Sequence, residues 1–285
     1  MHRTVAVAAV SVLAASLTLT VSAAGRPGGT DASTSPGVTS PTPAPSPTPD
    51  PSPTPSPSRS TTPSAPVADP FAGTSAVGAL FTVAKRGMRH FCTAAVVHSP
   101  KGDLVITAAH CLQGRRLGPG GNVIFVPGYH DGKFPKGRWA VMSEIVDSKW
   151  RKHKDANDDV AFLIVGRPGH KIEKYTGAET LETRTRMPQT VRVIGYPDST
   201  SAPVKCTAPA RLMHKAGLRQ LVFDCGGFTD GTSGGPFLMG VNAATGAGDV
   251  IGVIGGFQEG GDSPSVSYSA RFLLNVLDLY KRAIR

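Results

Sequence analysis

A serine stands inside a glycine-rich segment of the sequence, Asp230-Gly231-Thr232-Ser233-Gly234-Gly235-Pro236. Flanking glycines let the backbone turn tightly, which exposes the hydroxyl and points successive N–H groups into one concavity. We therefore expect Ser233 to be a nucleophile and the amides of Gly231 and Ser233 to form an oxyanion hole. An ordinary glycine-rich loop would have the same composition, so the hypothesis needs supporting residues elsewhere.

A serine hydroxyl is a weak nucleophile until a base takes its proton, so we searched for a histidine. His110 lies in Thr107-Ala108-Ala109-His110-Cys111, directly after an apolar run at 104–106. Small residues there allow a short helical turn that brings His110 close to another loop. The remaining histidines are predicted to be solvated or structural: His2, His90, His98, His130, His153, His170 and His214.

An imidazole base in turn needs a buried carboxylate that fixes its tautomer and stabilises the imidazolium. Asp159 begins the segment Asp159-Val160-Ala161-Phe162-Leu163 and leads into an apolar strand. Asp155 and Asp158 are close by, but they precede the strand in a polar loop, and we expect both to be solvated. Asp159 is therefore the predicted partner of His110.

Four cysteines complete the set of chemically distinctive residues: Cys92, Cys111, Cys206 and Cys225. Their spacing contains no Cys-x2-Cys pair, so we expect neither a metal site nor a cofactor. In an exported chain they predict two disulfides. Three pairings are possible, and sequence locality favours Cys92 with Cys111 and Cys206 with Cys225, each closing a loop of about 20 residues.

The elements that must position these residues are short β-rich runs broken by Gly, Pro, Asn and Asp. Such runs predict an all-β sandwich or barrel rather than alternating βα units. We expect strands at 78–83, 92–98, 103–108, 122–126, 139–146, 160–165, 190–196, 210–214, 219–224, 235–239, 250–257 and 265–269. Phe272, Val276, Leu279 and Ile284 have helical spacing, so residues 271–285 are predicted to be an amphipathic helix docked on the barrel.

Composition divides the 285 residues near position 70, because 14 of the 25 prolines precede it. Residues 1–24 have the polar start, uncharged run and small-residue end of a secretory signal peptide, and the 17-residue run is short for a stable membrane span. Residues 25–70 alternate Pro with Ser, Thr or Ala and predict a disordered linker, either removed, glycosylated or kept as a tether. Residues 71–285 remain as one domain, which we expect to be secreted and monomeric.

The formal charge of +10 belongs to this domain. A basic domain attracts anionic partners, and weak association with anionic cell-wall polymers is one expectation. The densest basic run is Arg151-Lys152-His153-Lys154, and no aromatic residues are interleaved as a base-stacking platform requires. The sequence therefore predicts no specific nucleic-acid partner.

Together, the segments around His110, Asp159 and Ser233 resemble the three motifs of the trypsin/chymotrypsin-like serine proteases, in that order along the chain. The resemblance covers residues 77–285 and implies two six-stranded antiparallel β-barrels with the site in the cleft between them. It implies a general base, an orienting carboxylate and a nucleophile in these three positions. It also implies the Cys92–Cys111 disulfide. The opening Val77-Gly78 and the stretch at 92–100 are similar to the bacterial secreted branch that includes glutamyl endopeptidases.

Several positions depart from the family pattern. Thr232 replaces the usual Asp before the serine, so activation by a new N-terminal ammonium cannot operate in the usual way. Gly227 replaces the acidic residue at the pocket base of trypsin-like enzymes, and the strand at 251–257 lacks the histidine of the glutamyl branch. Phe257 could narrow the pocket entrance or be ordinary rim packing. The expected substrate-binding residues are Gly227, Phe228, Gly255, Gly256 and Phe257, and the acids that could replace the missing one are Asp224, Asp230 and Asp262.

The favoured function is a secreted serine endopeptidase that hydrolyses protein or peptide substrates through an acyl-enzyme. The alternative is a non-catalytic binding or adhesion module on the same scaffold, which holds anionic wall polymers. All three triad residues are present, which disfavours the module. An HtrA-like housekeeping protease is a third interpretation, and the lack of a further domain after Arg285 counts against it.

Overall fold

The computed structural model describes residues 65–285. The predicted signal peptide and residues 25–64 of the predicted linker lie outside this part. Residues 65–70, the end of the predicted linker, lie inside it, and β1 (Asp69–Pro70) is already a strand. Within residues 65–285 no helix combines the length and the apolar character needed to cross a membrane.

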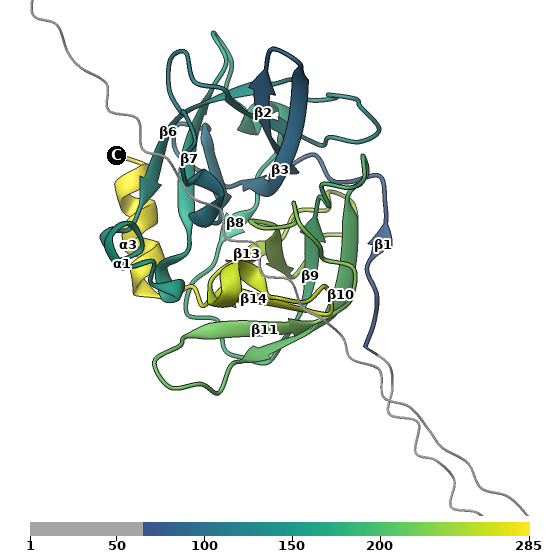
Figure 1. Ribbon diagram of the computed structural model, residues 1–285, viewed down its shortest axis with the longest axis vertical. Coiled ribbons are helices and arrows are strands. Elements are labelled where there is room, and N and C mark those ends of the chain that lie inside the picture. Colours follow the sequence, from purple (N-terminus) through teal and green to yellow (C-terminus); the bar gives the residue numbers. More distant parts are fainter. Residues whose placement is uncertain (1–64) are drawn as a thin grey trace, which may run out of the picture. The chain divides into compact units, whose positions relative to one another are not determined.

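The first half of the domain is a closed antiparallel barrel (Figure 1). Its strands follow one another in the order β2-β3-β4-β7-β6-β5, and each overlaps a strand predicted from the sequence, although β3 begins five residues earlier than predicted. The strands are β2 (Val77–Ala84), β3 (Gly87–Val96), β4 (Leu104–Thr107), β5 (Val123–Pro127), β6 (Trp139–Val146) and β7 (Ala161–Gly166).

The second half is an eight-stranded sheet in the order β14-β11-β10-β9-β12-β13-β8, with β1 paired to β10. The strands are β8 (Thr180–Leu181), β9 (Gln189–Gly195), β10 (Val204–Leu212), β11 (Gln220–Asp224), β12 (Pro236–Met239), β13 (Asp249–Val253) and β14 (Val266–Ala270). The all-β prediction is confirmed, but this sheet is not the closed six-stranded barrel that the resemblance implied. Between β13 and β14 there is no ladder, and the Val253 amide instead donates to the Ser269 hydroxyl at 2.9 Å.

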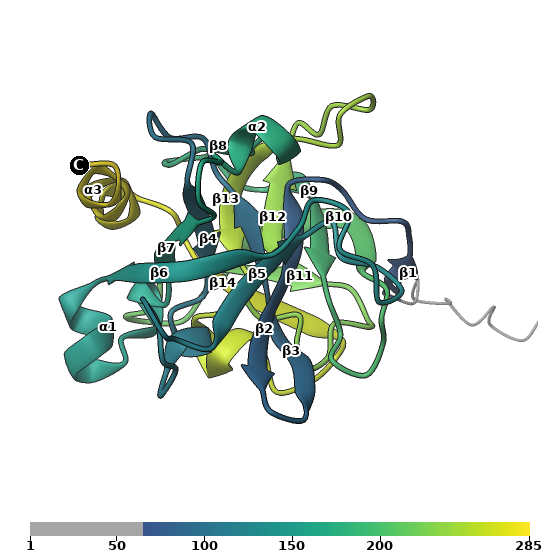
Figure 2. The same cartoon turned by 90° about the horizontal axis from the view of Figure 1, so that it is seen from above.

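Helices are short and lie at the edges of the domain (Figure 2). The C-terminal helix α3 (Leu274–Ala283) begins three residues later than predicted, and Phe272 is buried before it starts. Val276 and Leu279 pack towards β6 and β7, so the docked helix is confirmed. The other helical elements are α1 (Ser148–His153), α2 (Glu173–Thr176), η1 (His110–Leu112), η2 (Ala156–Asp158) and η3 (Phe257–Gly260).

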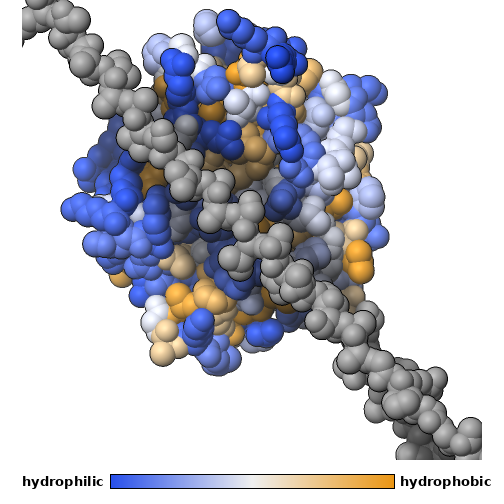
Figure 3. Space-filling view, viewed as in Figure 1, coloured by the Kyte–Doolittle hydropathy of each residue, from blue (hydrophilic) through white to orange (hydrophobic). Residues whose placement is uncertain are grey.

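The densest basic run of the sequence forms the end of α1. Arg151, Lys152 and His153 occupy its last turn, and Lys154 is its C-cap in the left-handed conformation. Hydrophilic side chains cover the side of the molecule where α1 and α3 lie (Figure 3). One cation is partly neutralised, because Arg151 pairs with Glu144 at 2.9 Å.

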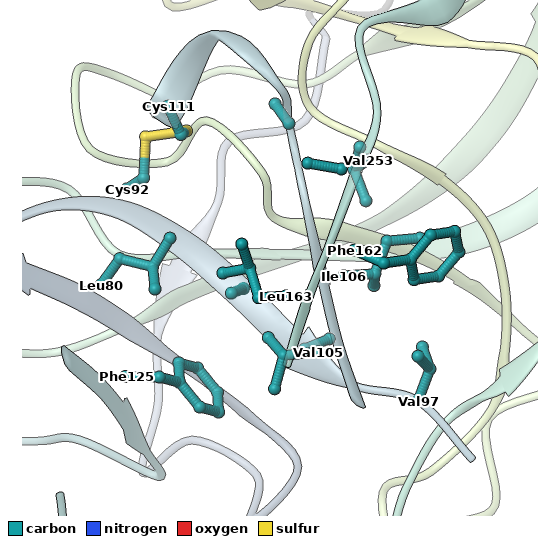
Figure 4. Packing of buried hydrophobic residues seen from close by; sticks show 14 of the residues in the cluster. Leu80, Cys92, Val97, Val105, Ile106, Cys111, Phe125, Phe162, Leu163 and Val253 are labelled. Atoms are coloured by element: carbon teal, nitrogen blue, oxygen red, sulfur yellow. A yellow bond between two sulfur atoms is a disulfide. The ribbon is translucent and has the colours of Figure 1, made fainter. Parts of the chain in front are cut away.

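One apolar cluster fills the closed barrel and continues into the second sheet. Leu80, Val105 and Leu163 are fully buried in it, and Val253 of β13 belongs to the same cluster (Figure 4). A smaller cluster around Phe223 fills the second sheet. Shared packing of this kind fixes the two halves against each other, because interdigitated side chains tolerate little displacement.

Both predicted disulfides are present. Cys92 pairs with Cys111, and Cys206 pairs with Cys225. The first joins β3 to η1, so it ties the turn that carries His110 to the barrel wall. The second joins β10 to the end of β11, directly before the loop that carries Ser233.

Candidate active site

His110 begins a short helical turn that follows β4, as its small neighbours predicted. Its ring Nδ1 donates to Asp159 Oδ2 at 2.8 Å, and its backbone N–H donates to Asp159 Oδ1 at 2.8 Å. The Gly256 amide also donates to Oδ2, at 2.7 Å. Three donors therefore hold a carboxylate with no exposed surface, which fixes both the position and the tautomer of the imidazole.

The electrostatics around His110 favour its charged form. Burial by itself lowers the pKa of the imidazole, but the hydrogen bond and charge of Asp159, with a further contribution from Glu259, outweigh it. The pKa of His110 therefore lies above its usual 6.5. A base of this kind is ready to take a proton and to be stabilised as the imidazolium.

The neighbouring acids have other roles. Asp155 caps η2, accepting from the Asn157 amide at 3.0 Å. Asp158 is buried rather than solvated, so that part of the sequence interpretation was wrong. Its Oδ1 accepts from Asn275 Nδ2 at 2.7 Å, because α3 covers the loop that the sequence left open to water.

Ser233 lies in the loop between β11 and β12, and this loop is pressed against the closed barrel. The Thr93 amide of β3 donates to the Ser233 carbonyl at 2.7 Å. At Gly234 any side chain would collide with that barrel, since a Cβ would stand 2.1 Å from the Thr107 hydroxyl oxygen. The glycine after the serine is thus required by close approach, which composition alone could not show.

The proposed oxyanion donors have the free N–H groups that the role requires. Gly231 has a φ of 90°, a left-handed conformation that favours glycine. Its carbonyl accepts from the Thr93 hydroxyl at 3.0 Å, which turns the peptide so that the carbonyl faces the barrel. In the part of the chain that the structure describes, neither the Gly231 amide nor the Ser233 amide donates a hydrogen bond.

Thr232, which replaces the usual acid, closes a local turn. Its buried hydroxyl donates to the Thr229 carbonyl at 2.6 Å, and its amide donates to the same oxygen at 3.1 Å. Val77 is an internal residue of the chain, fully buried, and is paired with Ala95 in the barrel. The loop that carries Ser233 is therefore ordered by its own turn and by Thr93, without a terminal ammonium.

His110 and Ser233 line one cleft of about 1210 Å³. Within residues 65–285 no hydrogen bond joins their side chains, which is common for catalytic pairs without bound substrate. The side formed by the closed barrel includes Arg86, Arg89 and Arg115. The side formed by the second sheet includes Phe228, Thr229, Asp230, Ile254, Glu259, Asp262 and Ser267.

Of the expected substrate-binding residues, Phe228 lines this cleft. Gly227, Gly255, Gly256 and Phe257 are not among the residues that line it, and Phe257 packs edge-on against Tyr268 at 5.2 Å with Lys215 over its ring. The ring of Phe257 thus contacts its neighbours on the second sheet rather than the space of the cleft. Among the alternative acids, Asp230 and Asp262 reach the cleft, whereas Asp224 pairs with Arg211 at 2.9 Å.

The sequence motifs do not indicate several residues of the cleft, namely Glu259 and the three arginines. Glu259 sits in η3 with a φ of 50°, and the arginines come from the β2–β3 hairpin and the loop after η1. Loop residues of this kind carry no periodic signal. A run of glycines around position 260 was the sole hint that a loop there would approach the site.

The chymotrypsin-like class is defined by a closed barrel and a second sheet, with a His–Asp pair and a serine in a glycine-rich loop at the junction between them. The family model described as Trypsin matches residues 73–272, so the chain belongs to the trypsin family. It is thus a member of a family of serine proteases.

Solved structures share the fold. Protease Anisep from Arthrobacter nicotinovorans is 22% identical with a TM-score of 0.63, and 76% of this chain covers 99% of that one. The thermostable serine protease AL20 from an extremophilic microorganism is 23% identical with a TM-score of 0.62, and the match covers 74% of this chain and 97% of that one. A Glu endopeptidase is 13% identical with a TM-score of 0.58, over 77% and 97%. A search of the curated proteins found no match.

Proposed function

We propose that this chain is an exported serine endopeptidase in which Ser233 is the nucleophile, His110 the base and Asp159 its orienting partner. One observation carries the proposal: a buried Asp159 holds His110 in the cleft that Ser233 also lines, beside two amides that donate no hydrogen bond within residues 65–285. The two disulfides agree with an oxidising compartment outside the cell.

The reaction follows from these positions. Ser233 Oγ attacks the carbonyl carbon of a peptide bond while His110 Nε2 takes the hydroxyl proton. The oxygen of the tetrahedral intermediate gains negative charge and accepts from the Gly231 and Ser233 amides. The intermediate then collapses, His110 gives its proton to the leaving amine, and the acyl-enzyme remains. Water repeats the sequence, with its proton going to His110 and then back to Ser233.

The decisive experiment compares two serines of the same cleft in the full chain. Ser233→Ala should abolish hydrolysis of a labelled protein substrate and covalent labelling by an organophosphorus reagent. Ser199→Ala is the matched control, because Ser199 also lines the cleft but is exposed and outside the triad. It should keep both activities.

Survival of hydrolysis and labelling in Ser233→Ala would overturn the proposal. If the unmodified chain shows no hydrolysis and binds an anionic wall polymer with a steep salt dependence, the binding-module function replaces it. Thermal unfolding of each variant shows whether a loss of activity reflects a loss of the fold.

A further inference from the structure

Residues 65–71 form a segment, here called the N-terminal strap, that lies along the second sheet. Its strand β1 pairs antiparallel with β10, with Asp69 opposite Lys205 and Pro70 opposite Val204. The Phe71 amide donates to the Pro203 carbonyl at 3.1 Å. The end of a proline-rich region, which composition assigns to a linker, is therefore built into the domain as an edge strand.

Before β1, the strap contacts the loop that leads to the nucleophile. The Gly226 amide donates to the Pro66 carbonyl at 2.7 Å, and the Ala68 amide donates to the Gly226 carbonyl at 2.8 Å. Val67 and Gly226 thus form a parallel bridge. Both backbone polar groups of Gly226 are bonded to the strap, directly after the disulfide at Cys225.

The next residue of the loop also rests on the strap. Gly227 has a φ of 92°, and a Cβ on it would stand 3.3 Å from the Cβ of Ala68. Ala68 is half-buried and packs against the cluster of the second sheet. Phe228 follows, lines the cleft, and meets Phe223 edge-on at 6.0 Å. The strap therefore lies directly behind the wall of the cleft.

We propose that the strap is a positioning element of the substrate pocket, with Pro66 and Ala68 holding the wall at Gly226 and Gly227 from behind. The inference rests on the proposed function and extends it to regulation. Removal of the linker upstream of residue 65 leaves the enzyme competent, whereas a cut within the strap releases the pocket wall. Thr93 holds the same loop near Ser233, and the strap holds it at Gly226, one residue after the disulfide at Cys225.

The test removes one hydrogen bond in the full chain. Ala68→Pro deletes the backbone N–H that donates to the Gly226 carbonyl. Val67→Pro also introduces a proline and deletes a backbone N–H, but one residue earlier. The Val67 amide donates to no residue within 65–285, and its side chain is 67% exposed, so Val67→Pro is the matched control. The measurements are KM and kcat on a peptide amide chosen from a mixed library, the rate of organophosphorus labelling, and the melting temperature.

We expect Ala68→Pro to raise KM by about tenfold, the size of effect that loss of one or two hydrogen bonds produces, with kcat and labelling changed far less. Val67→Pro should match the unmodified chain. If Ala68→Pro does not fold, Ala68→Ile keeps the amide and displaces Gly227 by bulk, and it should raise KM in the same way, with Ala68→Gly as its control.

Two failures are distinguishable. A KM of the folded Ala68→Pro or Ala68→Ile variant equal to that of the unmodified chain would overturn the strap proposal while leaving the protease assignment intact. Equal falls in kcat, labelling and melting temperature would also overturn it, since they indicate a structural role alone. An unmodified chain that neither hydrolyses peptides nor reacts with the organophosphorus reagent would overturn the proposed function, and the strap's role with it.

Discussion

The closed barrel and the second sheet contribute to the cleft in different ways. The barrel presents His110 and Asp159 from a turn and a strand start that are held by a disulfide, a sealed core and three hydrogen bonds to one carboxylate. The second sheet presents Ser233 from a loop whose ends are held by other segments, Thr93 of the barrel and Gly226 on the strap. Residues of the barrel make most of the contacts that position the proposed base, with one contact from the Gly256 amide of the second half. The loop of the proposed nucleophile depends instead on Thr93 of the other half and on the strap at the edge of its own sheet.

The largest effect expected within the barrel comes from Asp159→Asn. The Asn side chain has one oxygen and one NH2 group, so it cannot accept from His110 Nδ1 and from two backbone N–H groups as the carboxylate does. The wrong tautomer of His110 is then favoured, and kcat should fall by about 10⁴-fold. Asp158→Asn is the matched control, because Asp158 is adjacent and buried but bonded to Asn275. It should lower the melting temperature and preserve kcat. Similar losses of kcat in both variants would show that the barrel does not position the base through Asp159.

The junction between the halves should show a large effect on stability. Burial and, to a smaller extent, the charge of Asp249 raise the pKa of Glu179 to about 7, although the hydrogen bond from the Gly248 amide lowers it. The unfolded carboxyl titrates near 4.5, so the folded state holds the proton more tightly. The contribution of Glu179 to the free energy of unfolding is therefore greatest below about pH 4.5 and falls by up to about 3 kcal/mol as the pH rises to about 7.

Urea unfolding at several pH values tests this expectation. Glu179→Gln should remove the decline and be more stable than the unmodified chain at pH values above the pKa. Asp278→Asn is the control for loss of a surface charge, since its side chain is 69% exposed. A decline that persists in Glu179→Gln would place the titrating group elsewhere.

A smaller effect tests the dependence of the nucleophile loop on the barrel. The Thr93 hydroxyl donates to the Gly231 carbonyl at 3.0 Å and accepts from the Tyr196 amide at 2.8 Å. Thr93→Val removes both bonds, and we expect kcat to fall by about tenfold because the oxyanion donors lose their orientation. Thr93→Ser keeps the hydroxyl and should keep kcat. If Thr93→Val retains full kcat, the loop is positioned from its own sheet.

The smallest effect is on the pH profile. Asp159 and Glu259 raise the pKa of His110, although burial lowers it. The pH at which neutral His110 becomes the dominant form is therefore higher than the usual 6.5. The acid limb of kcat/KM should therefore have its midpoint above 6.5. Glu259→Gln removes one of the stabilising charges and should move this midpoint to lower pH. An unchanged midpoint would mean that the second sheet does not influence the base.

Much of the site was predictable from local patterns. The serine motif, the small residues before His110 and the apolar strand after Asp159 are short-range signals, and the strands of the barrel follow from β-rich runs bounded by turn residues. The disulfide pairs followed from proximity along the chain. These features depend on neighbours in sequence, so residue types and spacing are enough to indicate them.

Other features depended on contacts between distant segments. The sequence placed Asp158 in solvent, and it is buried because α3 returns from the far end of the chain to cover it. The strap at Ala68 and the wall at Gly226 are more than 150 residues apart, and no local pattern joins them. By itself the sequence determined the type of fold and the proposed reactive groups. The tertiary structure decided their surroundings, because burial and hydrogen bonding are set by whichever segments the folded chain brings together.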